Sequence, residues 1–334
     1  MEKSPPKITV LIPVYNAQEY IGASIASILN QTFRDFELLI INDGSTDDTA
    51  SVIDTFSDPR IRVFHNEKNL GIIDTPNRGI ELARGDYIAR MDADDIAYPK
   101  RLSKQIAFME RHSQIQILGA SIMPFGRKRI NLPWHNPSDH KEIQAGFLFG
   151  SPIASSTVMM RRSFLNKHHL RYDPRFPLCE DYYLWVRATG LGQAANLREP
   201  LVRYRFHPNQ ITQTNLVDNR TQSRIIRQLL LSQFVTNLCD SDMDLHEAII
   251  YNHSELSISF LKQALAWLEH LESCNEKTMR YEPAVLRKIL AWQWARLNFK
   301  SRSLGLQVWL QYLRSDYSDR YLLRWPRHAS MGRL

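Results

Sequence analysis

Short apolar runs alternate with helically spaced apolar residues through about the first 125 positions of the chain. The runs are rich in β-branched residues and predict strands at residues 8–12, 36–41, 61–64, 87–91 and 115–123. Apolar residues repeat at helical spacing between them, which predicts helices at residues 21–29, from 46–48 onward, at 72–84 and at 102–109. Such alternation is typical of an α/β fold with a mostly parallel sheet and helices on both faces.

The pattern becomes less regular after residue 125. A loop-like stretch at 131–138 precedes a predicted strand at 156–161 and a short helix after Glu180. From about residue 219 the chain looks helical, and we expect its helically spaced tryptophans in the core: Trp267, Trp292, Trp294, Trp309 and Trp325. These shifts predict one domain over residues 1–218, divided near residue 125, and a helical region over 219–334.

Three of the most polar loops follow predicted strands: Tyr15-Asn16, Asp43-Gly44-Ser45 and Asp92-Ala93-Asp94-Asp95. Ligands of α/β sheets bind beyond the carboxyl ends of strands. Asp92 and Asp94 point the same way if the extended conformation persists. Because adjacent carboxylates repel each other, a hard cation such as Mg²⁺ or Mn²⁺ that also holds a diphosphate would suit this loop. The alternatives are a solvated acidic turn for Asp92–Asp95 and a simple Asp-Gly turn for Asp43.

Charge and composition narrow the class of partner. The 334 residues carry a net charge of +7, but residues 1–100 hold 10 Lys and Arg against 16 Asp and Glu, so the excess of cations lies further on. The excess of acidic residues in positions 1–100 argues against a nucleic acid as the partner. Three separated cysteines favour a reducing compartment, no apolar run approaches the length of a membrane span, and the first residues lack a signal-peptide pattern. We therefore expect a cytoplasmic protein that is at most peripheral to a membrane.

Several short motifs follow one another along the chain. They are Ile12-Pro13-Val14-Tyr15-Asn16, Ile41-Asn42-Asp43-Gly44-Ser45, Asn69-Leu70-Gly71, Asn77-Arg78-Gly79, Gly85-Asp86-Tyr87, Met91-Asp92-Ala93-Asp94-Asp95, Glu180-Asp181-Tyr182-Tyr183 and Tyr204-Arg205-Phe206-His207-Pro208. Together they resemble the family 2 glycosyltransferases, over roughly residues 7–212. The resemblance implies a GT-A fold with a nucleotide-binding part at about 7–125 and an acceptor and catalytic part at about 126–218.

The resemblance also implies a reaction: transfer of a sugar, with inversion, from a nucleotide-diphosphate sugar in the presence of a divalent cation. A UDP-sugar is the donor that we expect. Carried over residue by residue, the nucleotide-sugar would be bound by Pro13, Tyr15, Asn16, Asp43, Asp92 and Arg78. Asp94 would ligate the metal, with Asp92 beside it and His207 as a further, tentative ligand.

Asp181 would be the general base that deprotonates the acceptor hydroxyl, and Glu180 would shape the site or contact the acceptor. One base and direct in-line attack invert configuration, whereas retention by double displacement needs a second, nucleophilic carboxylate. Structural interpretations remain open. Glu180 and Asp181 could simply begin a helix, Tyr15 could be a packing aromatic, and His207 could be structural. Arg78, Arg101 and Arg187 would pair with a diphosphate or with internal carboxylates.

The sequence departs from the family pattern at several positions, two of which belong to the part expected to bind the acceptor. Ser151 and Ser155 stand where Asn and His are common, and Pro76 should make its helix begin around that position. The chain lacks the Gln-x-x-Arg-Trp segment of processive synthases, so transfer of a single sugar in cell-surface polysaccharide or glycolipid assembly is the better hypothesis. The alternatives are a sugar nucleotidyltransferase, which would carry a Gly-rich loop after its first strand, and a non-catalytic nucleotide-sugar-binding or membrane scaffold protein.

The C-terminal tail suggests a second partner. Residues 321–328 mix arginines with aromatic and apolar residues, a composition that suits an anionic membrane surface. A glycan or lipid-linked acceptor is the partner that we expect beside the donor.

Overall fold

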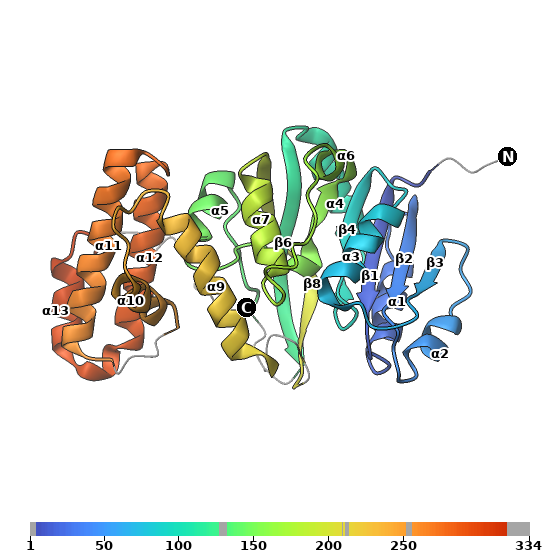
Figure 1. Ribbon diagram of the computed structural model, residues 1–334, viewed down its shortest axis with the longest axis horizontal. Coiled ribbons are helices and arrows are strands. Elements are labelled where there is room, and N and C mark those ends of the chain that lie inside the picture. The colour runs from blue at the N-terminus through green and yellow to red at the C-terminus, as the bar shows by residue number, and fades with distance from the viewer. Residues whose placement is uncertain (1–4, 127–131, 209, 211–213, 252–255, 319–334) are drawn as a thin grey trace. The chain divides into compact units, whose positions relative to one another are not determined.

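The computed structural model describes residues 5–126, 132–208, 210, 214–251 and 256–318 (Figure 1). The chain divides into two compact units. The first consists of residues 1–140 and 153–219, and the second of residues 141–152 and 220–334. The tail at 321–328, with Trp325, lies outside the described residues.

An eight-stranded sheet organises the first unit, in the order β3-β2-β1-β4-β7-β6-β8-β5. The strands are β1 (Ile8–Val14), β2 (Phe36–Asn42), β3 (Ile61–His65), β4 (Tyr87–Arg90), β5 (Ile96–Ala97), β6 (Ile115–Gly126), β7 (Met159–Arg161) and β8 (Gln193–Phe206). The pairs β1–β2, β1–β4, β2–β3 and β6–β8 are parallel, whereas β7 pairs antiparallel with β4 and β6, and β5 with β8. The predicted α/β class with a mostly parallel sheet is confirmed.

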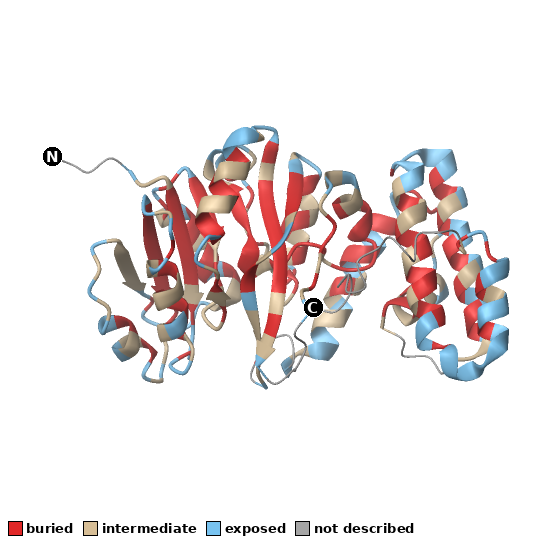
Figure 2. Ribbon diagram, turned by 180° about the vertical axis from the view of Figure 1, so that it is seen from behind, coloured by how far each residue is buried: buried red, intermediate tan, exposed pale blue. Residues whose placement is uncertain are grey.

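The central strands are buried on both faces, which Figure 2 shows as continuous red ribbon. All seven residues of β2 are buried, and Pro13 is the one residue of β1 that is not. Continuous apolar runs of this kind suit strands with helices on both sides. The helices of this unit are α1 (Ile21–Leu29), α2 (Thr49–Asp54), α3 (Gly71–Leu82), α4 (Arg101–Arg111), α6 (Arg162–Lys167) and α7 (Glu180–Thr189).

Three local predictions were wrong. Helix α3 begins at Gly71, so Pro76 lies inside the helix and not at its start. Pro76 is buried at this interior position. The predicted strand at 156–161 is a 3₁₀ turn, η1 (Ser155–Thr157), followed by the short β7. The fourteen-residue β8 was not predicted, because its exposed polar residues at 198 and 199 interrupt any apolar run.

The second unit is helical, as predicted. It contains α10 (Asp240–Tyr251), α11 (Ile258–Thr278), α12 (Pro283–Lys300), η2 (Arg302–Leu304) and α13 (Leu306–Arg314). The chain passes between the two units three times: within α5 (His140–Gly146), between residues 152 and 153, and within α9 (Leu216–Leu231). In the part of the chain that the structure describes, no helix combines the length and apolar character that crossing a membrane requires.

A buried histidine ties residues 141–152 to the helices of this unit. His246 Nε2 donates to the carbonyl of Leu148 over 2.7 Å, and Trp267 Nε1 donates to His246 Nδ1 over 3.1 Å. Burial lowers the pKa of His246 to about 3, so the ring is neutral. Trp267 and Trp294 are core residues as predicted, whereas Trp309 is 42% exposed, which corrects the expectation for that residue.

Gly85 shows how closely the chain approaches itself ahead of β4. Its N–H donates to Thr9 Oγ1 over 2.9 Å, and a Cβ at this position would lie 2.4 Å from the backbone nitrogen of Thr9. Gly85→Ala should lower the free energy of unfolding by about 1–3 kcal/mol, because backbone must move to admit the methyl group. Gly190→Ala is the matched control, since its Cβ would meet nothing nearer than 3.4 Å. Urea unfolding of both variants tests this, and equal stabilities would contradict it.

Candidate active site

Two loops at the carboxyl ends of β1 and β2 are tied together by side chains. Asn16, in a left-handed backbone conformation with φ of 47°, accepts from the N–H of Thr46 over 2.8 Å. Its own N–H donates to Ser45 Oγ over 3.0 Å. Asn tolerates this conformation better than most residues. Tyr15 beside it is 45% exposed, so its ring is open to a ligand at the edge of the sheet.

Asp43 is buried and clamps a neighbouring loop. Its Oδ1 accepts from Asn66 Nδ2 over 2.6 Å and from the N–H of Leu70 over 2.8 Å, and its Oδ2 accepts from the N–H of Gly71 over 2.9 Å. Arg78 Nη1 donates to Asn66 Oδ1. The predicted residues Asp43 and Arg78 are therefore brought to one place, with Asn66 between them.

The acidic loop after β4 is a turn, so the extended conformation that would point Asp92 and Asp94 the same way does not persist. The N–H of Asp95 donates to the carbonyl of Asp92, and this closes the turn. The two carboxylates consequently have different partners. Asp92 Oδ1 accepts from Arg90 Nη2 over 3.1 Å, and Asp94 Oδ2 lies 2.9 Å from His207 Nε2.

Strand pairing explains how His207 reaches a residue 113 positions earlier in the chain. β5, which directly follows the acidic loop, pairs antiparallel with β8 through Ile96 and Arg203. The same register continues past the strands: Asp95 Oδ1 accepts from the N–H of Arg205 over 2.8 Å. Arg205 Nε in turn donates to the carbonyl of Asp94 over 2.7 Å. Asp94 and His207 therefore meet because β8 returns along the acidic loop.

Arg90 lies at the centre of the carboxylates, and its side chain is only 11% exposed. Besides Asp92 it donates from Nη1 to Ser155 Oγ over 3.0 Å and to Tyr172 Oη over 3.2 Å. Burial disfavours its charge, but Tyr172 and the nearby carboxylates of Asp92, Glu180 and Asp181 raise the pKa of Arg90 above its ordinary value. The guanidinium therefore remains charged within the site.

Glu180 and Asp181 are the first two residues of helix α7, as predicted, and both interact electrostatically with Arg90. Desolvation, followed by the charge of Asp181, raises the pKa of Glu180 to about 8. Desolvation also raises the pKa of Asp181, while Arg90 and the backbone N–H of Tyr182, which donates to Asp181 Oδ1 over 2.6 Å, oppose the rise. Glu180 therefore binds its proton at pH values where an ordinary glutamate is ionised, and the pKa of Asp181 is also raised.

The donor set fits a divalent cation held by few protein ligands. No three His, Cys, Asp or Glu side chains of the described residues gather in a geometry that could hold a metal ion. Asp94 and His207 are nevertheless in contact, and the other ring nitrogen, His207 Nδ1, is buried without a hydrogen-bond partner among the described residues. One carboxylate and one imidazole suit Mn²⁺ or Mg²⁺ when substrate oxygens and water complete the coordination. Asp92 is directed to Arg90 instead.

Four residues of this site were given no role by the sequence-based prediction: Arg90, Tyr172, Asp95 and Arg205. A signal existed for Arg90, a cation at the end of β4 only two positions before the first carboxylate of the acidic loop. Asp95 is fully buried, and desolvation and its acidic neighbours raise its pKa well above the ordinary value. Of the other predicted arginines, Arg101 is buried beneath the loop and donates to the carbonyl of Arg90, and Arg187 donates to the carbonyl of Arg171.

Comparison with known proteins gives consistent relationships. Residues 9–170 match the model of the family described as glycosyl transferase family 2. A glycosyltransferase of Haemophilus influenzae is 37% identical over 235 residues, which cover 67% of this chain and 73% of the relative. WfaP of Escherichia coli, named a UDP-Glc:α-D-GlcNAc-diphosphoundecaprenol β-1,3-glucosyltransferase, is 27% identical and the match covers 66% of this chain and 86% of WfaP.

A solved structure has a similar fold. Residues 1–349 of Staphylococcus aureus TarS, crystallised with UDP-GlcNAc, superpose with a TM-score of 0.59 at 15% identity. The match covers 88% of this chain and 89% of the TarS chain. At this level of identity the likeness shows the fold alone.

The raised pKa of Glu180 predicts a pH-dependent stability. The folded protein binds the proton of the Glu180 carboxyl group more tightly than the unfolded chain does. The contribution of this group to the free energy of unfolding is therefore present at low pH and is lost as the pH rises toward about 8. Glu180→Gln removes the ionisable group. Its free energy of unfolding relative to the wild type should therefore increase between about pH 5 and pH 8 and level off above that. Urea unfolding across this range measures it. The exposed Glu81→Gln serves as control, and parallel curves for Glu180→Gln and the wild type would contradict the prediction.

Proposed function

We propose that this chain, which belongs to glycosyltransferase family 2, transfers a single sugar from a nucleotide-diphosphate sugar to an acceptor hydroxyl with inversion at the anomeric carbon. The observation that carries the proposal is that one largely buried cation, Arg90, bonds to Asp92 of the acidic loop and also interacts electrostatically with Glu180 and Asp181, while Asp94 of the same loop contacts His207. The GT-A fold is confirmed by the eight-stranded sheet and by the likeness to TarS.

The donor nucleotide would lie over the loops after β1 and β2. The exposed ring of Tyr15 offers a face for the base, with Pro13 and Asn16 bordering it. A carboxylate has about four lone-pair sites, and Asp43 uses three of them on Asn66, Leu70 and Gly71. The remaining site would accept the ring N–H of a pyrimidine. The name of WfaP supports a UDP-sugar as the donor.

The donor's diphosphate would lie at the acidic loop. Asp94 and His207 would hold a divalent cation there, with Asp92 beside them, and the bound cation would stabilise negative charge on the departing diphosphate. Asp92 is oriented by Arg90, and the buried Arg101 donates to the carbonyl of Arg90 from below. Arg78, fixed by Asn66, would bind the nucleotide-sugar from the side of Asp43.

Asp181 would deprotonate the acceptor hydroxyl as it attacks the anomeric carbon. Its raised pKa makes the carboxylate of Asp181 a stronger base than that of an ordinary aspartate. Glu180, protonated near neutral pH, would donate a hydrogen bond to the acceptor or shape its site. Both residues interact electrostatically with Arg90, which also bonds to Asp92, so the base would lie close to the acidic loop that would hold the leaving group.

The acceptor would be a glycan or a lipid-linked sugar in cell-surface glycan assembly. The name of WfaP, which includes a diphosphoundecaprenol-linked acceptor, supports this class. Such an acceptor would bring the enzyme to the cytoplasmic face of a membrane, with the arginines of residues 321–328 as an electrostatic contact.

Asp181→Asn tests the base. The carboxamide keeps the size of the side chain but cannot take a proton, so kcat should fall by about 10²–10⁴-fold while the Kd of the donor changes little. Transfer assays and donor calorimetry measure the two quantities. Asp86→Asn is the control, because Asp86 is an exposed aspartate whose partner is Lys7. Full activity of Asp181→Asn would refute the assignment, and loss of donor binding would point to a structural role.

His207→Ala and Asp94→Asn test the cation. Each should raise the Mn²⁺ or Mg²⁺ concentration needed for half-maximal activity by at least about tenfold, because each removes one of two protein ligands. Calorimetry of Mn²⁺ binding in the presence of UDP gives a readout besides activity. His169→Asn is the matched control: His169 is exposed with φ of 49°, a conformation that Asn tolerates. An unchanged metal requirement in both site variants would overturn this part of the proposal.

A further inference from the structure

Helix α13 presents its larger apolar residues to solvent. Leu306, Trp309, Leu310 and Leu313 are 72%, 42%, 42% and 66% exposed. Their spacing places all four on one stripe of the helix. Amphipathic helices of globular proteins normally direct such a stripe at the core. In α13 the core receives only Val308 and Tyr312.

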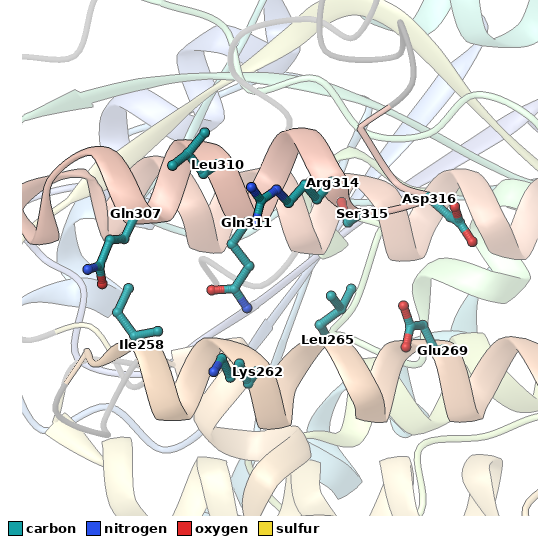
Figure 3. Close-up of a pocket in the computed structure, with 10 residues that line it drawn as sticks. All are labelled: Ile258, Lys262, Leu265, Glu269, Gln307, Leu310, Gln311, Arg314, Ser315 and Asp316. Atoms are coloured by element: carbon teal, nitrogen blue, oxygen red, sulfur yellow. The ribbon is translucent and has the colours of Figure 1, made fainter.

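The remaining face of α13 is polar and borders a groove against α11, with a cavity volume of about 460 Å³ (Figure 3). Gln307, Leu310, Gln311 and Arg314 line it from α13, and Ile258, Lys262 and Leu265 line it from α11. Figure 3 shows Gln311 extending from α13 toward α11. Leu310 therefore borders the groove as well as the solvent, whereas Leu306, Trp309 and Leu313 are exposed and take no part in its lining.

The exposure of the stripe is built into the fold, because α13 is held at both ends. Gly305, with φ of 87°, makes the turn that starts the helix. At the other end, Trp294 Nε1 donates to Ser315 Oγ over 2.8 Å, and the buried Tyr317 donates to Glu272 Oε2 over 2.7 Å. The helix cannot rotate its leucines inward without breaking these bonds.

Cations flank the apolar stripe. Lys300, Arg302 and Arg314 are exposed, and no acidic residue occurs between positions 300 and 314. The exposed Phe299 and Leu304 extend the apolar surface. The nearest acidic residues, Glu269 and Asp316, line the groove on the polar side of the helix. Beyond the helix, residues 320–334 contain four arginines and no acidic residue.

We propose that α13, together with Phe299 and Leu304, is a membrane-binding element that seats its apolar stripe in the interfacial region of an anionic bilayer. Leucine and tryptophan on one face with lysine and arginine beside them are the composition of helices that lie in this region. The cations at 300, 302 and 314 contact anionic head groups. A nine-residue helix is far too short to span a bilayer, so the attachment is peripheral.

Charge favours a membrane over a second copy of the chain. A two-fold interface through α13 would bring the cations of one copy near the same cations of the other, and like charges disfavour such pairing. Anionic lipid complements them instead. The inference concerns a surface of the second unit and does not depend on the proposed sugar transfer.

Sedimentation of the full-length protein with phosphatidylglycerol–phosphatidylcholine vesicles, without donor or acceptor, tests the proposal. Leu306→Ser with Leu313→Ser should weaken binding by about tenfold or more, because both side chains leave water in the bound state. Arg302→Glu with Arg314→Glu should remove the preference for anionic over neutral vesicles. Leu191→Ser, at a leucine of the first unit that is 54% exposed, should bind like the wild type.

Two further measurements separate the alternatives. Replacing Arg324 and Arg327 by Ser in the full chain should weaken vesicle binding less than the double leucine substitution does. If the arginine variant loses vesicle binding and the leucine variant does not, the tail and not α13 attaches the protein to the membrane, and the proposal is wrong. Light scattering without vesicles reports oligomeric state. If the leucine variant changes only oligomeric state and binds vesicles normally, α13 is a contact between copies and the proposal is wrong.

Discussion

The buried charge of Arg90 is the interaction on which the rest of the site depends. Without a cation, the carboxylates of Asp92, Glu180 and Asp181 would repel one another in a desolvated pocket and would take up protons. Arg90 bonds directly to Asp92, and its field reaches the other two. Its remaining hydrogen bonds, to Ser155 and Tyr172, join parts of the chain 65 and 82 positions away. One guanidinium therefore connects Asp92 of the acidic loop electrostatically to the two carboxylates at the start of α7.

Strand ends are the part of the site that the sequence reveals most directly. Apolar runs identify β1, β2 and β4, and parallel strands bring their carboxyl ends to one edge, so the pattern alone assigns Asn16, Asp43 and Asp92 to one region. Local geometry is less accessible. The acidic loop turns instead of extending, because its backbone closes on Asp92 and its side chains have separate partners. Periodicity carries no information on such long-range bonds.

The contacts that escaped prediction all depend on pairing between distant segments. Asp95 and Arg205 meet through the β5–β8 register, and a two-residue strand such as β5 leaves almost no pattern in the sequence. Pro76 inside α3 is a second case, since burial of Thr75 and Pro76 against the fold outweighs the hydrogen bond that proline cannot donate. Trp309 is a third. Helical spacing correctly placed it on an amphipathic helix, but spacing alone does not say which face meets the core.

The separation of charge along the chain has two physical origins. In the first unit, acidic residues gather where a diphosphate and its cation would bind, and the arginines that balance them, Arg90 and Arg101, are buried among them. These arginines are committed to internal partners and are not available to a polyanion. In the second unit Lys300, Arg302 and Arg314 lie at the surface beside exposed leucines. Cations in water next to apolar side chains complement a lipid surface better than a nucleic acid, because a phosphate backbone offers nothing for the leucines to enter.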